Sequence, residues 1–150
     1  MSDPAPAPEP DVRAFVYDSC RTRGLPPSAE ETASALDRRV AEIRAAFARL
    51  AEAHVLVLQP DGEILMAPPY SAVPTPFPVR GAGPSAYGNC IWDALGIPAR
   101  GRGDATILGS CACCGERLDV EVAGGSVRAR GGIIHFALPA RKWWDNIVFT

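Results

Sequence analysis

The stretch Gly88-Asn89-Cys90-Ile91-Trp92-Asp93-Ala94-Leu95-Gly96-Ile97-Pro98 places a thiol and a carboxylate three residues apart, directly after a Gly/Pro-rich break. This pattern predicts a helix that begins at about Cys90, with Cys90 and Asp93 on one face. Amide groups at a helix N-terminus favour an anion and lower the pKa of a cysteine, and the neighbouring acid could deliver a proton. The alternative interpretation is a buried, apolar cysteine followed by a salt-bridged aspartate.

A second sulfur-rich segment follows at Cys111-Ala112-Cys113-Cys114-Gly115. Its Cys-x-x-Cys spacing resembles one knuckle of a zinc ribbon, but a closed site needs a second ligand pair, so structural zinc is not expected from this chain alone. His135 or Cys113 could still complete an unusual site. A thioredoxin-like motif lacks its surrounding βαβ pattern, and a plain turn with small apolar residues is the third interpretation. Cys90, Cys111 and Cys114 are the candidate ligands for a soft metal.

Composition sets outer limits on the fold and the partners. The chain has 150 residues, of which 47% are hydrophobic and 21% charged, which suits a soluble globular protein with one moderate core or two small ones. Residues 1–10 form a Pro/Ala-rich stretch with no signal-peptide pattern, which predicts a disordered leader. Five clustered cysteines without an export signal favour reduced thiols in the cytoplasm. No apolar run approaches the roughly 20 residues that span a membrane.

The first half has the pattern of a small helical module over residues 11–67. Apolar residues at helical spacing from Val12 predict a helix that ends at Gly24, and the Ser28-x-x-Glu31 capping box opens a second helix that runs to about Leu36. A third helix is expected from about Asp37. Two apolar runs, residues 54–58 and 63–67, flank Pro60-Asp61-Gly62 and predict a hairpin. Three helices followed by a hairpin is the order of a winged helix-turn-helix.

The net charge of residues 1–80 indicates whether such a module is suited to binding DNA. Residues 1–80 contain eight arginines, no lysine and eleven acidic residues, a net charge of −3. Affinity for duplex DNA comes largely from neutralised phosphates, which a module of this charge serves poorly. Arg38, Arg39, Arg44 and Arg49 fall on or beside the third helix, interleaved with acids. A solvated face of a structural module is therefore favoured over a recognition helix, and nucleic acid is not the expected partner.

The second half combines a proline-rich arm with a set of strands. Residues 68–85 are too rich in proline for a helix or a central strand, and their apolar side chains predict an extended arm that lies across the second domain and walls its pocket. Residues 104–108, 118–122 and 126–130 have strand patterns. The apolar run 133–138 predicts a central strand that carries His135. A short helix is expected at 139–145, and 146–150 has the pattern of another buried strand.

Several of these segments together resemble the alkylmercury lyase (organomercurial lyase, MerB-like) family. They are Gly88–Pro98, Cys111-x-x-Cys114-Gly115-Glu116, Ile134-His135-Phe136 and Trp143-Trp144-Asp145, in the same order over residues 10–150. The resemblance implies an α/β (α+β) protein with an N-terminal winged-helix-like module and a MerB-like mixed-strand catalytic domain at 86–150. It also implies cleavage of a carbon–mercury bond without an added cofactor, with mercury bound at Cys90 and the proton delivered by Asp93.

One departure from the family pattern concerns a second cysteine. Well-studied members carry it just before the His-Phe segment, where this chain has Gly131-Gly132. Mercury(II) is soft and prefers thiolates, so Cys113 or Cys114 is the candidate replacement, while Cys111 matches a structural cysteine of the family. Two alternatives stay open. One is a MerB-like enzyme that acts on a different thiophilic substrate with Cys90 as nucleophile. The other is a non-catalytic metal- or thiol-sensing winged-helix protein.

Overall fold

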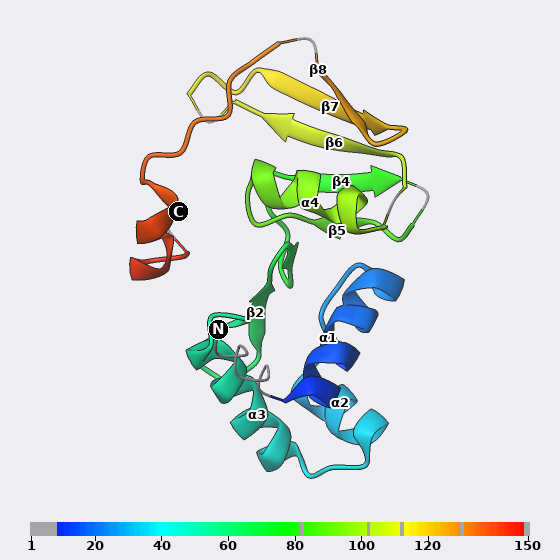
Figure 1. Cartoon of the computed structure of the whole chain (residues 1–150), viewed down its shortest axis with the longest axis vertical. Coiled ribbons are helices and arrows are strands. Elements are labelled where there is room, and N and C mark those ends of the chain that lie inside the picture. Colours follow the sequence, from blue (N-terminus) through cyan, green and yellow to red (C-terminus); the bar gives the residue numbers. More distant parts are fainter. Residues whose placement is uncertain (1–8, 82, 102, 112, 130, 149–150) are drawn as a thin grey trace, which may run out of the picture.

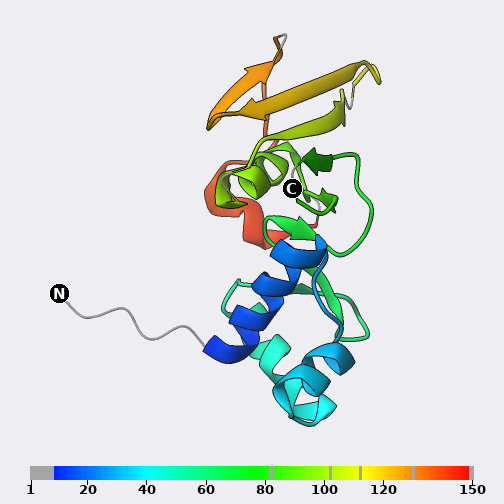
Figure 2. The ribbon, with the colours of Figure 1, turned by 90° about the vertical axis from the view of Figure 1, so that its right-hand side faces the viewer.

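The computed structural model describes residues 9–81, 83–101, 103–111, 113–129 and 131–148. Figures 1 and 2 show an elongated molecule with the N-terminal helices at one end and a five-stranded sheet at the other. The elements follow in the order α1 (Pro10–Arg23), α2 (Ala29–Leu36), α3 (Val40–Glu52), β1 (Val57–Leu58), β2 (Ile64–Ala67), β3 (Tyr70–Ser71), β4 (Pro78–Gly81), β5 (Ala86–Tyr87), α4 (Ile91–Gly101), β6 (Ala105–Ser110), β7 (Arg117–Ala123), β8 (Ser126–Ala129) and the 3₁₀ helix η1 (Ala140–Asp145).

The three N-terminal helices confirm the sequence prediction in order and approximate bounds. Ser28 accepts a hydrogen bond from the Glu31 amide at 3.0 Å, and the Glu31 carboxylate accepts one from the Ser28 amide at 2.8 Å, so the predicted capping box is formed. Gly24 ends α1 in the left-handed conformation. Residues 9 and 10 do not belong to a disordered leader, because Glu9 is the N-cap residue of α1 and its carboxylate pairs with Arg49, and Pro10 is the first residue of the helix; residues 1–8 lie outside the described part of the chain.

A three-stranded antiparallel sheet, β1-β2-β3, follows the helices and includes the predicted hairpin. The apolar faces of α1 and α3 meet this sheet in a core whose largest members are Phe47, Ile43, Leu50 and Leu56. Three helices followed by a hairpin is the predicted order of elements, and the winged-helix assignment itself stays a prediction.

The second sheet is antiparallel with the strand order β5-β4-β6-β7-β8, and α4 packs on it through the fully buried Ala94. The strands predicted at 104–108, 118–122 and 126–130 correspond to β6, β7 and β8; residue 130 lies outside the described residues. Ile97 of α4 packs against both cores, and an isolated bridge joins Tyr70 to Gly88. The helix therefore lies where the two parts of the molecule meet.

Residues 68–85 were predicted to form an extended arm without a central strand. This prediction is wrong for part of the segment, which forms a strand of the second sheet. Its segment Pro78–Gly81 is β4, a central strand between β5 and β6. Proline is tolerated there because Pro78 stands at the first position, so the remaining residues of the strand keep their amide donors. The arm does wall a pocket, because Pro68 and Pro69 line the cavity that contains Asp93.

Residues 133–138 do not form the predicted central strand. Ile133 is 94% exposed, and the chain leaves the sheet after β8 along the orange segment of Figure 1. The cause lies just before the apolar run, where Gly131 and Gly132 adopt φ angles of 129° and 113°, a region that side chains with a Cβ rarely enter. The predicted short helix is present as η1, whereas Asn146–Val148 is not a strand, and 149–150 lie outside the described residues.

No helix in the described part of the chain is both long enough and apolar enough to cross a membrane.

Candidate active site at the start of helix α4

Cys90 immediately precedes α4, as predicted, and its carbonyl accepts the amide of Ala94 at 2.9 Å. The approach to the helix is tightly fixed. The Gly88 amide donates to the Phe77 carbonyl at 3.1 Å, and the Gly88 carbonyl accepts from the Thr75 hydroxyl at 2.6 Å. A Cβ on Gly88 would lie 2.4 Å from the Ala94 nitrogen, so only glycine allows the chain to pass this close to the helix. The arm thus holds the start of α4 in place.

The thiol of Cys90 experiences two opposing influences. The backbone amides of Asp93 and Trp92 hydrogen-bond to it and lower its pKa, as expected at a helix N-terminus, but burial has the larger effect and raises the pKa overall. The predicted net lowering is therefore wrong. A raised pKa favours the S–H form of this half-buried thiol, and a soft metal that binds the sulfur displaces the proton.

Asp93 lies in the first turn of α4, three residues after Cys90, and is partly buried. Burial raises the pKa of its carboxyl group, and the amide of Asn89 partly offsets this by donating to Asp93 Oδ2 at 2.9 Å. A carboxyl group with a raised pKa keeps its proton to higher pH, which suits a proton donor. Asp93 also lines a cavity of about 410 Å³ together with Pro68, Pro69 and Trp92.

Asn89 was not predicted as a site residue. Besides the bond to Asp93, its Nδ2 lies 3.5 Å from the Tyr70 carbonyl, and its Oδ1 is buried without a hydrogen-bond partner among the described residues. A buried amide oxygen without a donor is costly, and the Nδ2 of the same side chain donates to the Asp93 carboxyl group. The only sequence signal for this role was the position of an asparagine directly before the cysteine.

Cys111, Cys113, Cys114 and Gly115 lie in the turn between β6 and β7, and residue 112 lies outside the described residues. The Cys111 amide donates to the Glu116 carbonyl at 2.8 Å and the Gly115 amide to the Cys111 carbonyl at 2.8 Å. The amides of Cys114 and Cys113, followed by the Cys114 thiol, hydrogen-bond to the Cys111 sulfur and lower its pKa. Amide donors that converge on one sulfur are typical of Cys-x-x-Cys turns. The pKa of Cys111 is therefore lowered, whereas that of Cys90 is raised.

Burial and the neighbouring residues Asp93 and Trp92 shift the pKa of Cys90. The residues of the β6–β7 turn are not among the causes of this shift. Among the described residues, no group of three or more His, Cys, Asp or Glu side chains lies close enough to hold a metal ion. The five cysteines are free thiols, with Cys113 and Cys114 exposed. Joint action of Cys90 with Cys113 or Cys114, and the ligand set Cys90, Cys111 and Cys114, remain predictions.

The aromatic C-terminal segment lies beside α4. A cavity of about 630 Å³ is lined by Trp92, His135, Phe136 and Trp143, among others. The rings of Phe136 and Trp143 are 5.0 Å apart, and the Trp143 indole donates to the Leu138 carbonyl at 3.0 Å. Trp92 lines this cavity as well as the one that contains Asp93, so the Ile-His-Phe and Trp-Trp-Asp segments gather next to the Cys-x-x-Asp helix.

Comparison with known proteins identifies the group to which this arrangement belongs. The family model described as "MerB: Alkylmercury lyase" matches residues 70–150, more than half of the chain and all of the sheet that carries α4. The chain belongs to the alkylmercury lyase family. The family assignment confirms the resemblance drawn from the Cys-x-x-Asp helix and the segments that follow it.

The fold has a counterpart among solved structures. The mercury-bound form of MerB2 superposes with a TM-score of 0.63 at 19% sequence identity, over 81% of this chain. At that identity the likeness establishes the α+β fold. The match spans 60% of the MerB2 chain. The search of curated proteins found no match.

Proposed function

We propose that this chain cleaves carbon–mercury bonds in organomercurials, with Cys90 as the capturing thiol and Asp93 as the proton donor. The observation that carries the proposal is the pairing of these groups one helical turn apart, with the Asp93 amide bound to the thiol and the Asp93 carboxyl group biased toward its protonated form by burial. Membership of the alkylmercury lyase family supports it.

In the first step, the Cys90 sulfur displaces a ligand X from R–Hg–X, which forms a sulfur–mercury bond and releases the thiol proton with X as HX. The mercury atom then joins the Cys90 sulfur to the organic group R. The half-buried thiol suits this exchange, because mercury binds the thiolate strongly enough to displace the proton. Partial burial also keeps bulk water from the sulfur once mercury is bound.

In the second step, Asp93 donates its proton to the carbon bound to mercury. The carbon–mercury bond breaks, its electron pair forms the new carbon–hydrogen bond, and R leaves as R–H. The Asp93 carboxylate that remains offsets the positive charge left on the Cys90-bound mercury(II). Two free thiols in solution then remove mercury as a dithiolate, and their two protons return to the Cys90 sulfur and the Asp93 carboxylate. All steps use protein side chains and thiols, so no added cofactor is part of the proposal.

A second thiolate would assist the bond-breaking step, because two soft ligands donate more electron density to mercury than one. Gly131 and Gly132, which stand where the family has a cysteine, adopt φ angles that a cysteine would rarely tolerate. We therefore assign the assisting role to the β6–β7 turn. Cys113 and Cys114 are exposed and available for it, and Cys90, Cys111 and Cys114 remain the candidate ligands for the mercury ion.

Methane release from methylmercury in excess thiol tests the proposal. Cys90→Ser and Asp93→Asn should each lower the rate by at least about a hundredfold, as expected when a nucleophile or general acid is lost. The matched control is Asp119→Asn, which removes an exposed carboxylate paired with Arg117. Cys113→Ser or Cys114→Ser should lower the rate by a smaller factor. Wild-type rates in both Cys90→Ser and Asp93→Asn would refute the proposal.

One rival function has an observation in its favour. The absence of a cysteine at Gly131-Gly132 fits a family member that acts on another thiophilic substrate through Cys90. No methane release from the wild-type protein, with Cys90 still open to alkylation, would favour that rival.

Five free thiols also suit the reducing cytoplasm, where we place this activity.

The sensor hypothesis has less support from the N-terminal module. Each arginine on or beside α3 is paired with an acid: Arg38 with Glu9 and Asp11, Arg39 with Glu42, Arg44 with Glu63 and Arg49 with Glu9. Arginines that are already neutralised contribute little to phosphate binding.

A further inference from the structure

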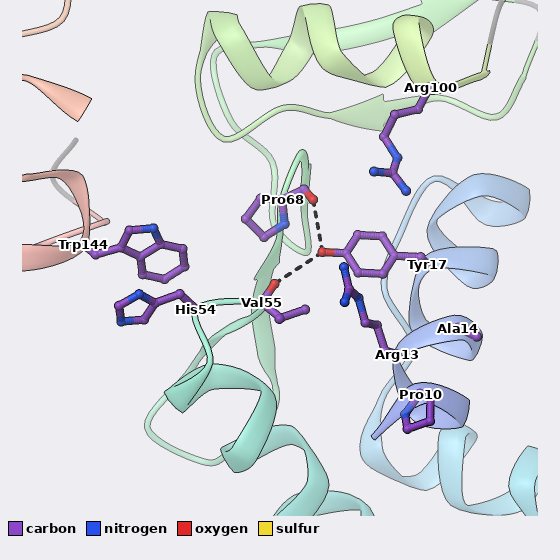
Figure 3. A pocket seen from close by; sticks show the side chains of 9 residues that line it. All are labelled: Pro10, Arg13, Ala14, Tyr17, His54, Val55, Pro68, Arg100 and Trp144. Atoms are coloured by element: carbon purple, nitrogen blue, oxygen red, sulfur yellow. Dashed lines mark hydrogen bonds between the residues drawn. The ribbon is translucent and has the colours of Figure 1, made fainter. Parts of the chain in front are cut away.

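A further cavity, which shares Pro68 and Arg100 with the cavity that Asp93 lines, lies where the N-terminal helices meet the C-terminal segment. It has a volume of about 570 Å³ and is lined by residues of α1, the turn after α3, the end of α4 and η1. Figure 3 shows its main side chains, with Tyr17 and two arginines on one side and His54 with Trp144 on the other. Five segments that are distant in sequence, including the arm at Pro68, thus contribute to one cavity, and neither Cys90 nor Asp93 is among its lining residues.

Positive charge gathers on one side of this cavity. The guanidinium of Arg100 lies 5.2 Å from the centre of the Tyr17 ring, and Arg13 and Arg100 are the charges that act most strongly on the Tyr17 hydroxyl. Asp93 is the acid whose charge also reaches this hydroxyl, and its effect is smaller than that of either arginine. Among the described residues, neither Arg13 nor Arg100 has a carboxylate partner. These two cations therefore contrast with the paired arginines around α3.

Aromatic rings line the same cavity in fixed positions. The Tyr17 hydroxyl lies within hydrogen-bonding distance of the Val55 carbonyl at 3.3 Å and the Pro68 carbonyl at 3.2 Å, which ties α1 to both β1 and the arm. The ring of His54 stacks on Trp144 with centroids 4.3 Å apart and an angle of 7° between planes. The Tyr17 and Trp144 rings are held on opposite sides of the cavity, and Arg13 and Arg100 lie beside Tyr17. A flat ligand can therefore bind with little reorganisation of these side chains.

We propose that this cavity binds a small aromatic carboxylate. Guanidinium groups bind carboxylates through paired, charge-assisted hydrogen bonds, and Arg13 and Arg100 are free to make them. Tyr17 and Trp144 present aromatic surface to the ring of the ligand. The volume falls in the range of small-molecule sites. Such binding is independent of mercury and of Cys90, and it extends the protein's function to a second ligand class.

Benzoate is the probe, added to the full chain without mercury and followed by calorimetry and by the NMR signal of the Trp144 indole N–H. We expect saturable binding that shifts this signal. Benzamide, which lacks the charge, and cyclohexanecarboxylate, which lacks the aromatic ring, should each bind more weakly than benzoate, benzamide by about tenfold because it loses charge-assisted bonds. These comparisons use the wild-type protein, so they hold whatever the variants do.

Variants then locate the site. Arg13→Gln and Arg100→Gln should each weaken benzoate binding by about tenfold, while Arg128→Gln, an exposed arginine on β8, should leave it unchanged. Cys90→Ser should bind benzoate as the wild type does, which separates this result from the outcome of the lyase assay. Equal binding of benzoate and benzamide, no saturable shift at Trp144, or wild-type affinity in both arginine variants would overturn the proposal.

Discussion

The two parts of this molecule differ in how completely they bury their apolar residues. Among the described residues, fourteen buried ones form the core of the N-terminal helices and the first sheet, one of them being Ala86 of β5, whereas four form the core under α4. All four residues of β8 are exposed, as are Trp92 at 59% and Ile133 at 94%. The N-terminal part therefore supplies most of the packing energy, while the C-terminal part carries the reactive groups on a smaller core.

The largest expected effect tests this division directly. Phe47 is fully buried in the N-terminal core, so Phe47→Ala should lower the free energy of unfolding by about 3–5 kcal/mol. Val127 on β8 is 59% exposed, and Val127→Ala should change it by less than about 0.5 kcal/mol. Urea unfolding followed by circular dichroism measures both. Similar losses for the two variants would contradict the division.

The second prediction concerns Asn89, which lies where the two parts meet. Its amide stabilises the ionised form of Asp93, whose pKa burial raises. Replacing it in Asn89→Leu removes the donor, so the pKa of Asp93 should rise further. Protonated Asp93 is the active form in the proposed reaction, so the fall in single-turnover rate on the alkaline side should move to higher pH.

The pH profile of methane release distinguishes this role from a structural one. Asn89→Leu should shift the alkaline limb, whereas Asp119→Asn should leave it in place. A uniform loss of rate at every pH, with no displacement of the limb, would show that Asn89 only supports the fold.

The third prediction compares the thiols of the two parts. Burial raises the pKa of Cys20 to about 12 and also raises that of Cys90, while amides and a neighbouring thiol lower that of Cys111. Limiting iodoacetamide at neutral pH should therefore label Cys111 before Cys90, and Cys20 last, because the thiolate is the reacting species. Peptide mapping by mass spectrometry gives the order. Early labelling of Cys20 would mean that the N-terminal core opens readily.

These contrasts also mark what the sequence could predict. Local patterns decided the elements that depend on local contacts, such as the Ser28–Glu31 capping box and the alternating strand β7. The helix that presents Cys90 and Asp93 was predicted for the same reason. The predictions failed where contacts between residues distant in sequence determine the structure or the pKa. Burial of Cys90 by the rest of the fold reverses the expected direction of its pKa, and two glycines direct an apolar run away from the sheet.

Residues that act only through the tertiary structure had no signal in the sequence. Tyr17 and His54 are far apart in the chain, and no motif connects them with Arg100 or Trp144. Asn89 stood inside the decisive stretch, but its bond to Asp93 depends on how the arm fixes Gly88. The reactive side chains Cys90 and Asp93 were therefore predictable from the sequence, while residues that contact them in the fold, such as Asn89, were not.

The last prediction concerns the ion pair between Arg23 and Glu31 on the surface of the N-terminal part, which should contribute only slightly to the free energy of unfolding. Arg23 donates to Glu31 at 2.7 Å and, together with the capping bond from Ser28, lowers the pKa of Glu31 to about 2. A lowered folded-state pKa contributes stability that is present above the unfolded value near 4.5 and is lost as pH falls toward 2. Both side chains are about half exposed, so solvent screening should hold the contribution below about 1 kcal/mol. Urea unfolding at pH 7 and pH 2.5 should therefore show that Glu31→Gln is slightly less stable than the wild type at the higher pH and closer to it at the lower. An equal deficit at both values would assign the loss to the cap geometry, which does not titrate, and would leave the charge of Glu31 without a role in the stability of the N-terminal part.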